Sequence, residues 1–266
     1  MNPIKHFGLK FAGFSCAFTS TPEFYRYIKK YYGETTVSIT EVQNKDISAT
    51  CVVSHKNGSF GYSSLNIHQH NLKFRINIQG TLHFYYPLLS NILQRMYASL
   101  FYAYGGIVLH GSAVLANNQA YLFLGPSGSG KTTIARVSEM NHGYQILADN
   151  HLFLKSSDEG VFLYPFPFDT FHNRNPIHRS YPVANAFFIL QSNTNKITPL
   201  DFKQARSCFT ANVQIQTSQF GDETANTLWE KALFSLFASG KLSLLHFRKD
   251  GLFWKLINGK KQSTDR

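Results

Sequence analysis

The pattern of apolar and polar positions changes in character along the chain. Over residues 36–86, short runs of β-branched or alternating residues are separated by turn-forming residues. Alternation with a period of two is typical of strands that bury one face, so these runs predict an antiparallel meander. A further strand is predicted over residues 6–16, and a short helix from residue 21 to a natural stop at Gly33.

After residue 86 the apolar spacing becomes helical and then returns to strands. Leucine and aromatic residues recur at helical spacing over residues 88–104. Apolar runs over residues 107–115 and 120–124 flank the tight turn Asn117-Asn118, which predicts a β-hairpin. Later expected elements are helices near residues 132–141, 201–208 and 222–238, and strands near residues 144–148, 151–154, 161–164, 183–190 and 242–248.

This change of pattern predicts two domains. A smaller β-rich domain, residues 1–86, is expected at the N-terminus, where substrate recognition is one role open to it. Residues 87–266 are expected to form an α/β core, α+β when the whole chain is considered, with a twisted sheet and flanking helices.

Composition narrows the class of protein. Hydrophobic residues make up 43% and aromatic residues 15%, which argues against intrinsic disorder. The 26 Lys and Arg against 15 Asp and Glu give a net charge of +11. Such an excess suggests a polyanionic partner, a membrane surface or a phosphorylated ligand, and an ordinary compositional bias explains it equally well. The scattered cysteines Cys16, Cys51 and Cys208 predict neither a disulfide framework nor a zinc site, and they fit a reducing compartment.

Several partners are not expected. No apolar stretch reaches the roughly 18 uninterrupted residues of a membrane span, and no clear cleavage site follows the basic N-terminal stretch. No Lys/Arg-rich run with interleaved aromatic residues points to nucleic acid. We therefore expect a cytoplasmic protein that binds neither a membrane nor nucleic acid, and a homo-oligomer is an open option.

The strongest chemical signal is the octapeptide GPSGSGKT, which fits the pattern G-x-x-x-x-G-K-[ST]. Its glycines let the backbone curl so that consecutive N–H groups point inward, and the helix that follows adds its positive N-terminal end. Lys131 is suited to reach phosphate oxygens and Thr132 to contact Mg²⁺. The alternative is a glycine-rich loop with no ligand. The residues predicted to bind phosphates are Gly125, Pro126, Ser127, Gly128, Ser129, Gly130, Lys131, Thr132 and Thr133.

Asp149 is the second signal. It ends the apolar run QILA, and its separation from Lys131 leaves room for one helix and one strand. A strand beside the one before the loop would deliver Asp149 to the phosphate end of the sheet. There an aspartate can hold Mg²⁺ or accept a proton from an attacking hydroxyl. The alternative is a turn aspartate, because Asp149-Asn150 is also good turn chemistry.

His110, in LHGSA, is the third signal. The predicted hairpin would bring its strand beside the strand that precedes the glycine-rich loop. Gly111 next to it leaves space near the backbone, so a phosphate contact is one interpretation. A packed strand histidine without a chemical role is the other, and the sequence does not decide between them.

The run over residues 105–155 resembles the kinase core of HPr kinase/phosphorylase and its relatives. The motifs that carry the resemblance are His110-Gly111, the loop from Gly125 to Thr132, His142-Gly143 and Asp149-Asn150. The resemblance weakens toward residue 257, where residues 185–191 and 201–205 are similar to a later strand and helix, and it does not extend over residues 1–86. With its own β-rich front, the chain looks more like the small peptide-serine kinases of the lasso-peptide-tailoring type than like the bifunctional enzyme.

The resemblance implies a P-loop kinase core that uses ATP or GTP with Mg²⁺. It implies that Lys131 and the loop amides bind the phosphates and that Thr132 contacts the metal ion. Asp149 matches the first aspartate of a pair and is implied as the general base, and His110 matches an active-site histidine. Asn150 stands where the second metal-binding aspartate is expected, and a neutral amide is a weaker cation ligand.

A second departure concerns the loop over residues 166–180. It lies where the bifunctional enzyme has a loop with glycine, arginine and a metal-binding glutamate, and no convincing copy is present, which argues against phosphorolysis and a second metal site. The loop offers candidate contacts to substrate or phosphate, or else incidental charges in a solvated loop. These candidates are Asp169, His172, Arg174 and Arg179.

Three functions are weighed. The first is an ATP-dependent kinase that phosphorylates a hydroxyl, serine for preference, of a peptide or small protein. The second is a small-molecule P-loop kinase, although such kinases usually carry the loop close to the chain start. The third is a catalytically weak nucleotide-binding scaffold, which the neutral Asn150 favours.

Overall fold

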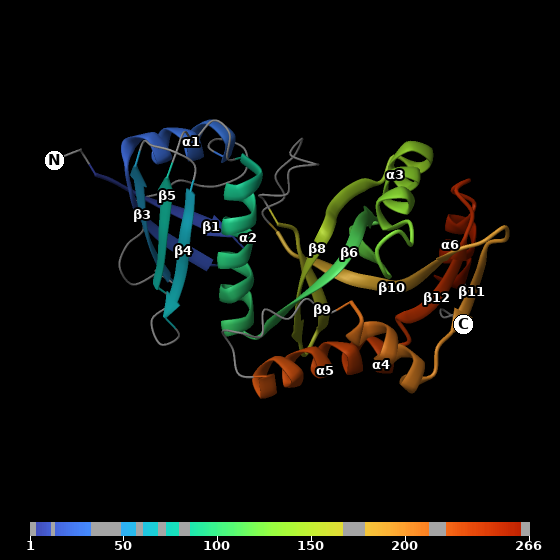
Figure 1. Ribbon diagram of the computed structural model, residues 1–266. Coiled ribbons are helices and arrows are strands. Elements are labelled where there is room, and N and C mark those ends of the chain that lie inside the picture. Colours follow the sequence, from blue (N-terminus) through green and yellow to red (C-terminus); the bar gives the residue numbers. More distant parts are fainter. Residues whose placement is uncertain are drawn as a thin grey trace. The chain divides into compact units, whose positions relative to one another are not determined.

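The protein is described from a computed structural model, shown in Figure 1. The structure describes residues 4–11, 14–32, 49–56, 61–68, 73–79, 86–166, 179–212 and 222–261. The chain divides into two compact units. The first comprises Met1–Tyr104, Phe166–Arg179 and Gln216–Gly221, and the second comprises Gly105–Pro165, Ser180–Ile215 and Asp222–Arg266.

The first unit contains a five-stranded sheet in the order β1-β2-β3-β5-β4. Its strands are β1 (Lys5–Phe11), β2 (Phe14–Ser20), β3 (Ala49–Lys56), β4 (Gly61–His68) and β5 (Lys73–Gln79), and its helices are α1 (Pro22–Tyr32) and α2 (Tyr86–Ala103). The predicted strand over residues 6–16 is two strands. The meander predicted over residues 36–86 is confirmed for the antiparallel pair β4–β5 and wrong for β3–β5, which is parallel, as is β2–β3. Alternation reports only which face is buried, whereas the direction of β3 follows from the crossover through α1.

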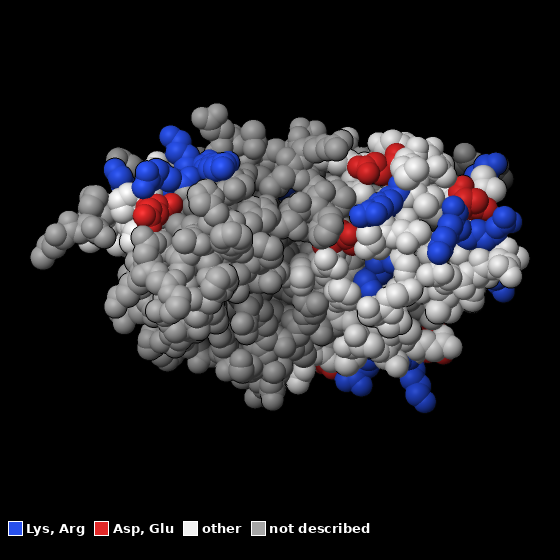
Figure 2. Space-filling model, turned by 45° about the horizontal axis from the view of Figure 1, so that its top comes forward, with Lys and Arg blue, Asp and Glu red and all other residues white. Residues whose placement is uncertain are grey.

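Helix α1 illustrates how the first unit builds its core. Phe24 and Ile28, one helical turn apart, are fully buried, and Phe24 lies 6.4 Å from Phe18 of β2 between ring centroids. The opposite face exposes Arg26 and Lys29. Figure 2 shows basic and acidic side chains next to one another at this end of the first unit, and also on the visible face of the second.

The second unit contains a seven-stranded sheet in the order β11-β12-β10-β7-β6-β8-β9, flanked by helices. Strands β7, β10 and β12 are parallel neighbours, and the other neighbouring pairs are antiparallel. The predicted α/β core with flanking helices is confirmed as this mixed sheet. Its elements are β6 (Gly106–Ala116), β7 (Gln119–Leu124), α3 (Lys131–His142), β8 (Gln145–Ser157), β9 (Gly160–Tyr164), β10 (Tyr181–Gln191), β11 (Lys196–Pro199), α4 (Phe202–Thr210), α5 (Asp222–Ala238), β12 (Leu242–Phe247) and α6 (Phe253–Lys261).

The predicted β-hairpin is confirmed as β6 and β7. Asn117 and Asn118 have φ of 51° and 58°, so both adopt the left-handed conformation that a two-residue type I′ turn requires. Asparagine tolerates this conformation better than most side chains, because its short polar side chain hydrogen-bonds locally. The turn sets the antiparallel register that places Gly111 opposite Leu124 at the end of β7.

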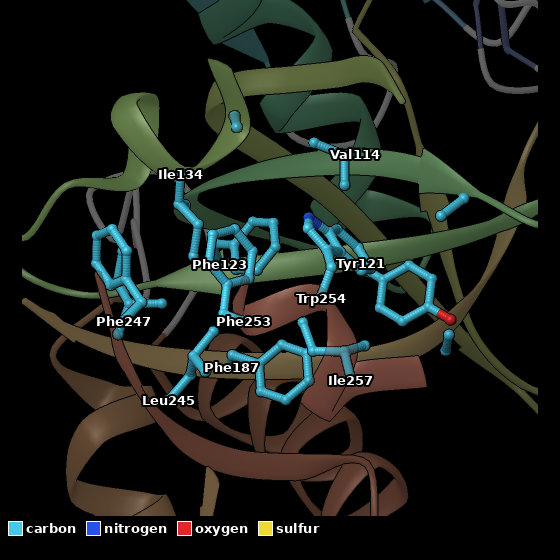
Figure 3. Packing of buried hydrophobic residues seen from close by; sticks show 14 of the residues in the cluster. Val114, Tyr121, Phe123, Ile134, Phe187, Leu245, Phe247, Phe253, Trp254 and Ile257 are labelled. Atoms are coloured by element: carbon cyan, nitrogen blue, oxygen red, sulfur yellow. The ribbon is translucent and has the colours of Figure 1, made fainter. Parts of the chain in front are cut away.

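One hydrophobic core of the second unit lies where α3 and α6 pack on the sheet (Figure 3). Trp254 of α6 is fully buried, and its ring lies 5.0 Å from Tyr121 and 6.3 Å from Phe123, both of β7. Ile134 of α3 belongs to the same cluster. Each large apolar side chain that is fully buried contributes on the order of 1.5–3 kcal/mol to stability. Ile134 and Ala135 therefore anchor α3 on the sheet.

The predicted domain boundary after residue 86 stays a prediction. The compact units divide after Tyr104, so α2 groups with the first unit. Within the described ranges, no helix has both the length and the apolar character needed to span a bilayer.

Candidate active site

The glycine-rich loop connects β7 to α3, and its backbone conformation requires glycine. Gly128 and Gly130 have φ of 78° and 101°, in the left-handed region. A Cβ added to Gly130 would lie 2.8 Å from Cζ of the buried Phe247, so the close approach of β12 also excludes a side chain there. The Gly130 carbonyl accepts the N–H of Ile134 at 2.8 Å, which begins α3 directly after the loop.

Lys131 is held over the loop that precedes it. Its Nζ donates hydrogen bonds of 2.8 Å to the carbonyls of both Gly125 and Pro126, and the residue is only 7% exposed. Burial lowers the pKa of Lys131, and the Asp149 carboxylate acts in the opposite direction. The Lys131 amine thus lies near the start of α3, where the helix dipole adds positive potential.

Thr132 and Asp149 meet at this same helix end. The Thr132 hydroxyl donates to Oδ1 of Asp149 at 3.0 Å, and Asp149 is 4% exposed. The strand that carries Asp149, β8, lies beside β6 rather than beside β7, so β6 separates it from the strand before the loop. Helix α3 packs over both β6 and β8, which explains how Thr132 reaches Asp149.

The strand that was expected to end at Asp149 is longer than the sequence predicted. Strand β8 runs from Gln145 to Ser157 and continues through Asn150, whose φ is 92°. A positive φ is strained for a residue other than glycine, and the polar, exposed Asn150 interrupts the apolar pattern where the strand is locally distorted. Positive φ at a non-glycine residue is a feature that clusters at functional sites.

His110 lies on β6 opposite His151 of β8. Its Nδ1 donates to the Asn150 carbonyl at 3.0 Å, so the neutral ring carries its proton on Nδ1 and an acceptor on Nε2. Burial, and next the charge of Lys131, lower the pKa of His110, while the Asn150 carbonyl and Asp149 act in the opposite direction. The structure thus links His110 to three of the other predicted residues, Lys131, Asp149 and Asn150.

The expected space beside Gly111 is filled by the protein itself. A Cβ there would lie 2.6 Å from Cδ1 of Leu152 and 2.9 Å from the Phe123 carbonyl. Glycine is required by the close packing of β6 against its neighbours, and the interpretation that Gly111 makes room for a ligand is wrong.

Three polar contacts to the loop were not predicted. Asn212 Oδ1 accepts the Gly125 N–H at 2.9 Å, the Gln191 amide donates to the Gly128 carbonyl at 3.2 Å, and the Ser112 hydroxyl donates to the Lys131 carbonyl at 2.7 Å. Ser112 lies in the LHGSA run that was already singled out, whereas Asn212 and Gln191 belong to no motif. Only the folded chain brings them to the loop.

The loop also holds a buried hydroxyl without a protein partner. Ser129 Oγ is inaccessible to solvent and has no hydrogen-bond partner in the described part of the chain. Leaving a buried donor unpaired costs about 1–3 kcal/mol, so an anion bound in the loop would supply the missing acceptor.

The remaining predicted residues are placed as follows. Pro126 and Ser127 are exposed at the tip of the loop, and Thr133 is half-buried in the first turn of α3. Arg179 is exposed, whereas Asp169, His172 and Arg174 lie outside the described residues. No group of three or more His, Cys, Asp or Glu residues suited to a metal ion occurs in the ranges that the structure describes.

Comparison with known proteins gives a family and a distant structural likeness. A family model described as "SynChlorMet cassette protein ScmC" matches residues 88–257, beginning close to the predicted boundary after residue 86. No curated protein matches the chain.

Among solved structures, one match is titled "Structure of the Hpr(Ser) kinase/phosphatase from Coxiella burnetii". The identity is 7% and the TM-score 0.33, and the match covers 60% of this chain and 99% of that one. So distant a likeness carries no conclusion about chemistry. The family match, in contrast, spans more than half of the chain and includes the glycine-rich loop, His110 and Asp149, and the chain therefore belongs to the ScmC family of SynChlorMet cassette proteins.

Proposed function

We propose that this protein is an ATP-dependent kinase that transfers the γ-phosphoryl group to a hydroxyl group of a peptide or small protein, serine for preference. One observation carries the proposal above all. Thr132, the residue after the loop lysine, donates to the buried carboxylate of Asp149 at 3.0 Å. That contact joins a phosphate-binding loop to a carboxylate, and phosphoryl transfer needs both.

The loop offers binding groups for a polyphosphate. Backbone N–H groups at the start of α3, the Lys131 ammonium and the Ser129 hydroxyl are all donors, as an anion requires. Lys131 presently donates to two loop carbonyls. Phosphate oxygens would give this ammonium charged acceptors, and hydrogen bonds between charged groups are roughly twice as strong as neutral ones.

The oxygen atoms at Thr132 and Asp149 fit Mg²⁺, which prefers hydroxyl and carboxylate ligands over nitrogen or sulfur. The amide of Asn150, the next residue along β8, is a further, neutral candidate ligand. When bound, the ion would neutralise charge on the phosphate oxygens. With a single carboxylate here, the site would depend on the nucleotide and water for the remaining ligands.

The proposed chemistry assigns the proton to Asp149. The acceptor oxygen forms a bond to the γ-phosphorus as the bond to the β–γ bridging oxygen breaks, and the diphosphate leaves with that electron pair. Asp149 takes the proton that the hydroxyl loses. His110, neutral and with an acceptor at Nε2, would orient the reacting groups without adding positive charge of its own.

The acceptor class rests on the sequence resemblance to peptide-serine kinases rather than on geometry. Residues 1–86 are proposed to recognise the acceptor, and a cytoplasmic location fits ATP as the donor. ATP is preferred over GTP here only as the commoner donor.

Mass spectrometry of serine-containing peptides after incubation with ATP and Mg²⁺ tests the proposal. We expect phosphorylated peptide with wild-type protein and none with Lys131→Ala, with Gly143→Ala as the matched control because it alters the far end of α3. Transfer to a sugar or nucleotide with no peptide modified would favour the small-molecule kinase. Tight ATP binding without any transfer would favour the scaffold.

A further inference from the structure

Asn212 follows α4 and is 4% exposed. Its side-chain Oδ1 accepts the Gly125 N–H at 2.9 Å, and its Nδ2 donates to the Cys208 carbonyl at 2.7 Å. Its backbone carbonyl accepts the N–H of His110 at 2.8 Å. One buried residue thus joins the end of α4, the first residue of the glycine-rich loop and the strand that carries His110.

The contact with Gly125 matters because Gly125 also binds the side chain of Lys131. The N–H of Gly125 is bound to Asn212, and its carbonyl accepts the Lys131 ammonium at 2.8 Å. Both peptide groups of Gly125 are therefore held, one by Asn212 and the other by Lys131. Gly125 is also packed closely, since an added Cβ would lie 2.7 Å from Ser129 Oγ.

We propose that Asn212 is a positioning residue for the phosphate-binding loop: it fixes the Gly125 peptide group and, through it, the place of the Lys131 ammonium. This inference rests on the proposed function. Asn212 does not touch the reacting atoms. Its effect is to keep the loop in the curled conformation before the nucleotide arrives, so that binding does not have to order it.

A purely structural role at the end of α4 would need only Nδ2, which donates to the Cys208 carbonyl. The contact with the loop uses the other side-chain atom, Oδ1. Asn195 is a suitable control in the same unit. Its side chain also makes two hydrogen bonds, to the Arg248 N–H and to Asp250, and it contacts neither the loop nor α4 among the interactions of the described residues.

The test compares Asn212→Ala with Asn195→Ala by calorimetry with ATP and Mg²⁺, alongside thermal denaturation. We expect Asn212→Ala to raise the Kd for ATP by about tenfold or more, because the nucleotide must then order the loop on binding. Asn195→Ala should stay within about twofold of wild type at a comparable loss of Tm. Equal loss of affinity in both variants, or an unchanged Kd in folded Asn212→Ala, would overturn the inference.

Two further measurements keep the proposal testable if Asn212→Ala does not fold. Hydrogen exchange of the Gly125 amide in wild-type protein should be slow compared with that of Gly128, and equally fast exchange at both amides would reject the contact. Asn212→Asp keeps an acceptor for the Gly125 N–H, but it can replace the Nδ2 donor to the Cys208 carbonyl only when its carboxyl group is protonated. At acidic pH it should therefore protect the Gly125 amide, and unprotected exchange there in the folded variant would reject the contact. A wild-type protein that does not bind ATP rejects the proposed function itself, whereas normal ATP binding by Asn212→Ala rejects only the role of Asn212.

Discussion

The two ends of helix α3 are stabilised in opposite ways. At the N-terminal end, Gly130 is left-handed with no side-chain cap, and Lys131 binds the backbone of the loop that precedes it. At the C-terminal end, Gly143 caps the helix by donating to the Glu139 carbonyl at 2.9 Å. Both ends use a left-handed glycine, but only the N-terminal end belongs to the candidate active site.

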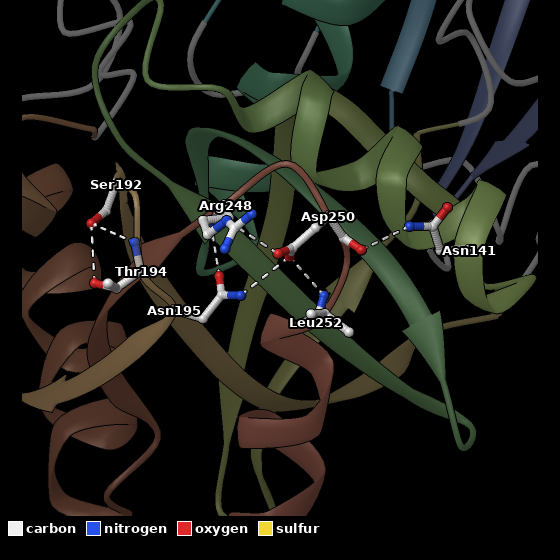
Figure 4. A network of polar contacts seen from close by, with 7 residues as sticks. All are labelled: Asn141, Ser192, Thr194, Asn195, Arg248, Asp250 and Leu252. Carbon is white, nitrogen blue, oxygen red and sulfur yellow. Dashed lines mark hydrogen bonds and ion pairs between the residues drawn. The ribbon is translucent and has the colours of Figure 1, made fainter.

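The C-terminal end is tied to the loop after β12. Asn141 donates to the Asp250 carbonyl at 3.1 Å, and His142 donates to the Gly251 carbonyl at 3.1 Å. Figure 4 shows how Asp250 in turn binds Arg248 and Asn195. The partners at this end belong to the protein and are neutral carbonyls or a paired carboxylate.

Buried packing reinforces the same end. Trp254 donates to the Ser138 hydroxyl at 2.8 Å, and its ring lies 4.6 Å from that of Tyr144. Buried residues along the helix, from Lys131 to Ser138, fix α3 on the sheet, and the two ends differ in their polar partners. The donors at the N-terminal end are thereby held in place, and in the proposed function they bind the phosphates of a nucleotide.

The largest expected effect comes from the chemistry at the N-terminal end. Asp149→Asn keeps an oxygen for the Thr132 hydroxyl but cannot take a proton, so phosphoryl transfer should fall by about 10³-fold. ATP affinity, measured by calorimetry, should stay within a few-fold of wild type. Transfer at the wild-type rate in this variant would remove Asp149 as the base.

Removing the anchor at the C-terminal end should cost stability instead. Trp254→Ala deletes a fully buried side chain at the centre of the cluster in Figure 3, and we expect unfolding to become easier by about 3–5 kcal/mol in denaturant titrations. The folded fraction should bind ATP with an affinity close to that of wild type at low temperature. A Kd that rises as steeply as in Lys131→Ala would show that the two ends are not separable.

The two capping glycines offer a matched pair. Gly130→Ala combines a left-handed φ of 101° with a contact of 2.8 Å to Phe247, so it should cost about 2–4 kcal/mol and weaken ATP binding about tenfold or more. Gly143→Ala has a φ of 68° and open space around the new Cβ, so it should cost about 1–2 kcal/mol and leave the Kd unchanged. Equal effects of the two variants on ATP binding would contradict the comparison.

The smallest effect is electrostatic and concerns His110. Because burial and the charge of Lys131 lower the pKa of its imidazole, an NMR titration should find it below the ordinary value of about 6.5. Lys131→Ala removes the positive charge, so the pKa of His110 should rise. A pKa that does not change in this variant would mean that Lys131 exerts no field at His110.

Local sequence accounted for the parts of the site whose geometry is local. The octapeptide predicted the loop and the start of α3, because glycine conformation and helix initiation depend on neighbouring residues. Asn117-Asn118 predicted the hairpin for the same reason, since only a few residues tolerate a positive φ at both turn positions.

The sequence was less informative where the direction of a strand, or the packing of residues far apart in the chain, decides the structure. It predicted an antiparallel meander over residues 36–86, where β4 and β5 are antiparallel but β3 and β5 are parallel. It ended the Asp149 strand too early, because the polar Asn150 interrupts the apolar run without ending the pairing with β6. It also predicted that Gly111 leaves space for a ligand, whereas the side chain of Leu152 fills that space.

By itself, therefore, the sequence determined the glycine-rich loop, the residues at the start of α3 and an α/β core, since each depends on short-range backbone preferences and periodicity. Only the tertiary structure decided that Thr132 meets Asp149 across β6, and that Asn212 binds Gly125 from the end of α4. A tight turn fixes the register only of the hairpin that it closes. Hydrogen bonds between residues far apart in the chain depend also on strand order, which no local pattern encodes.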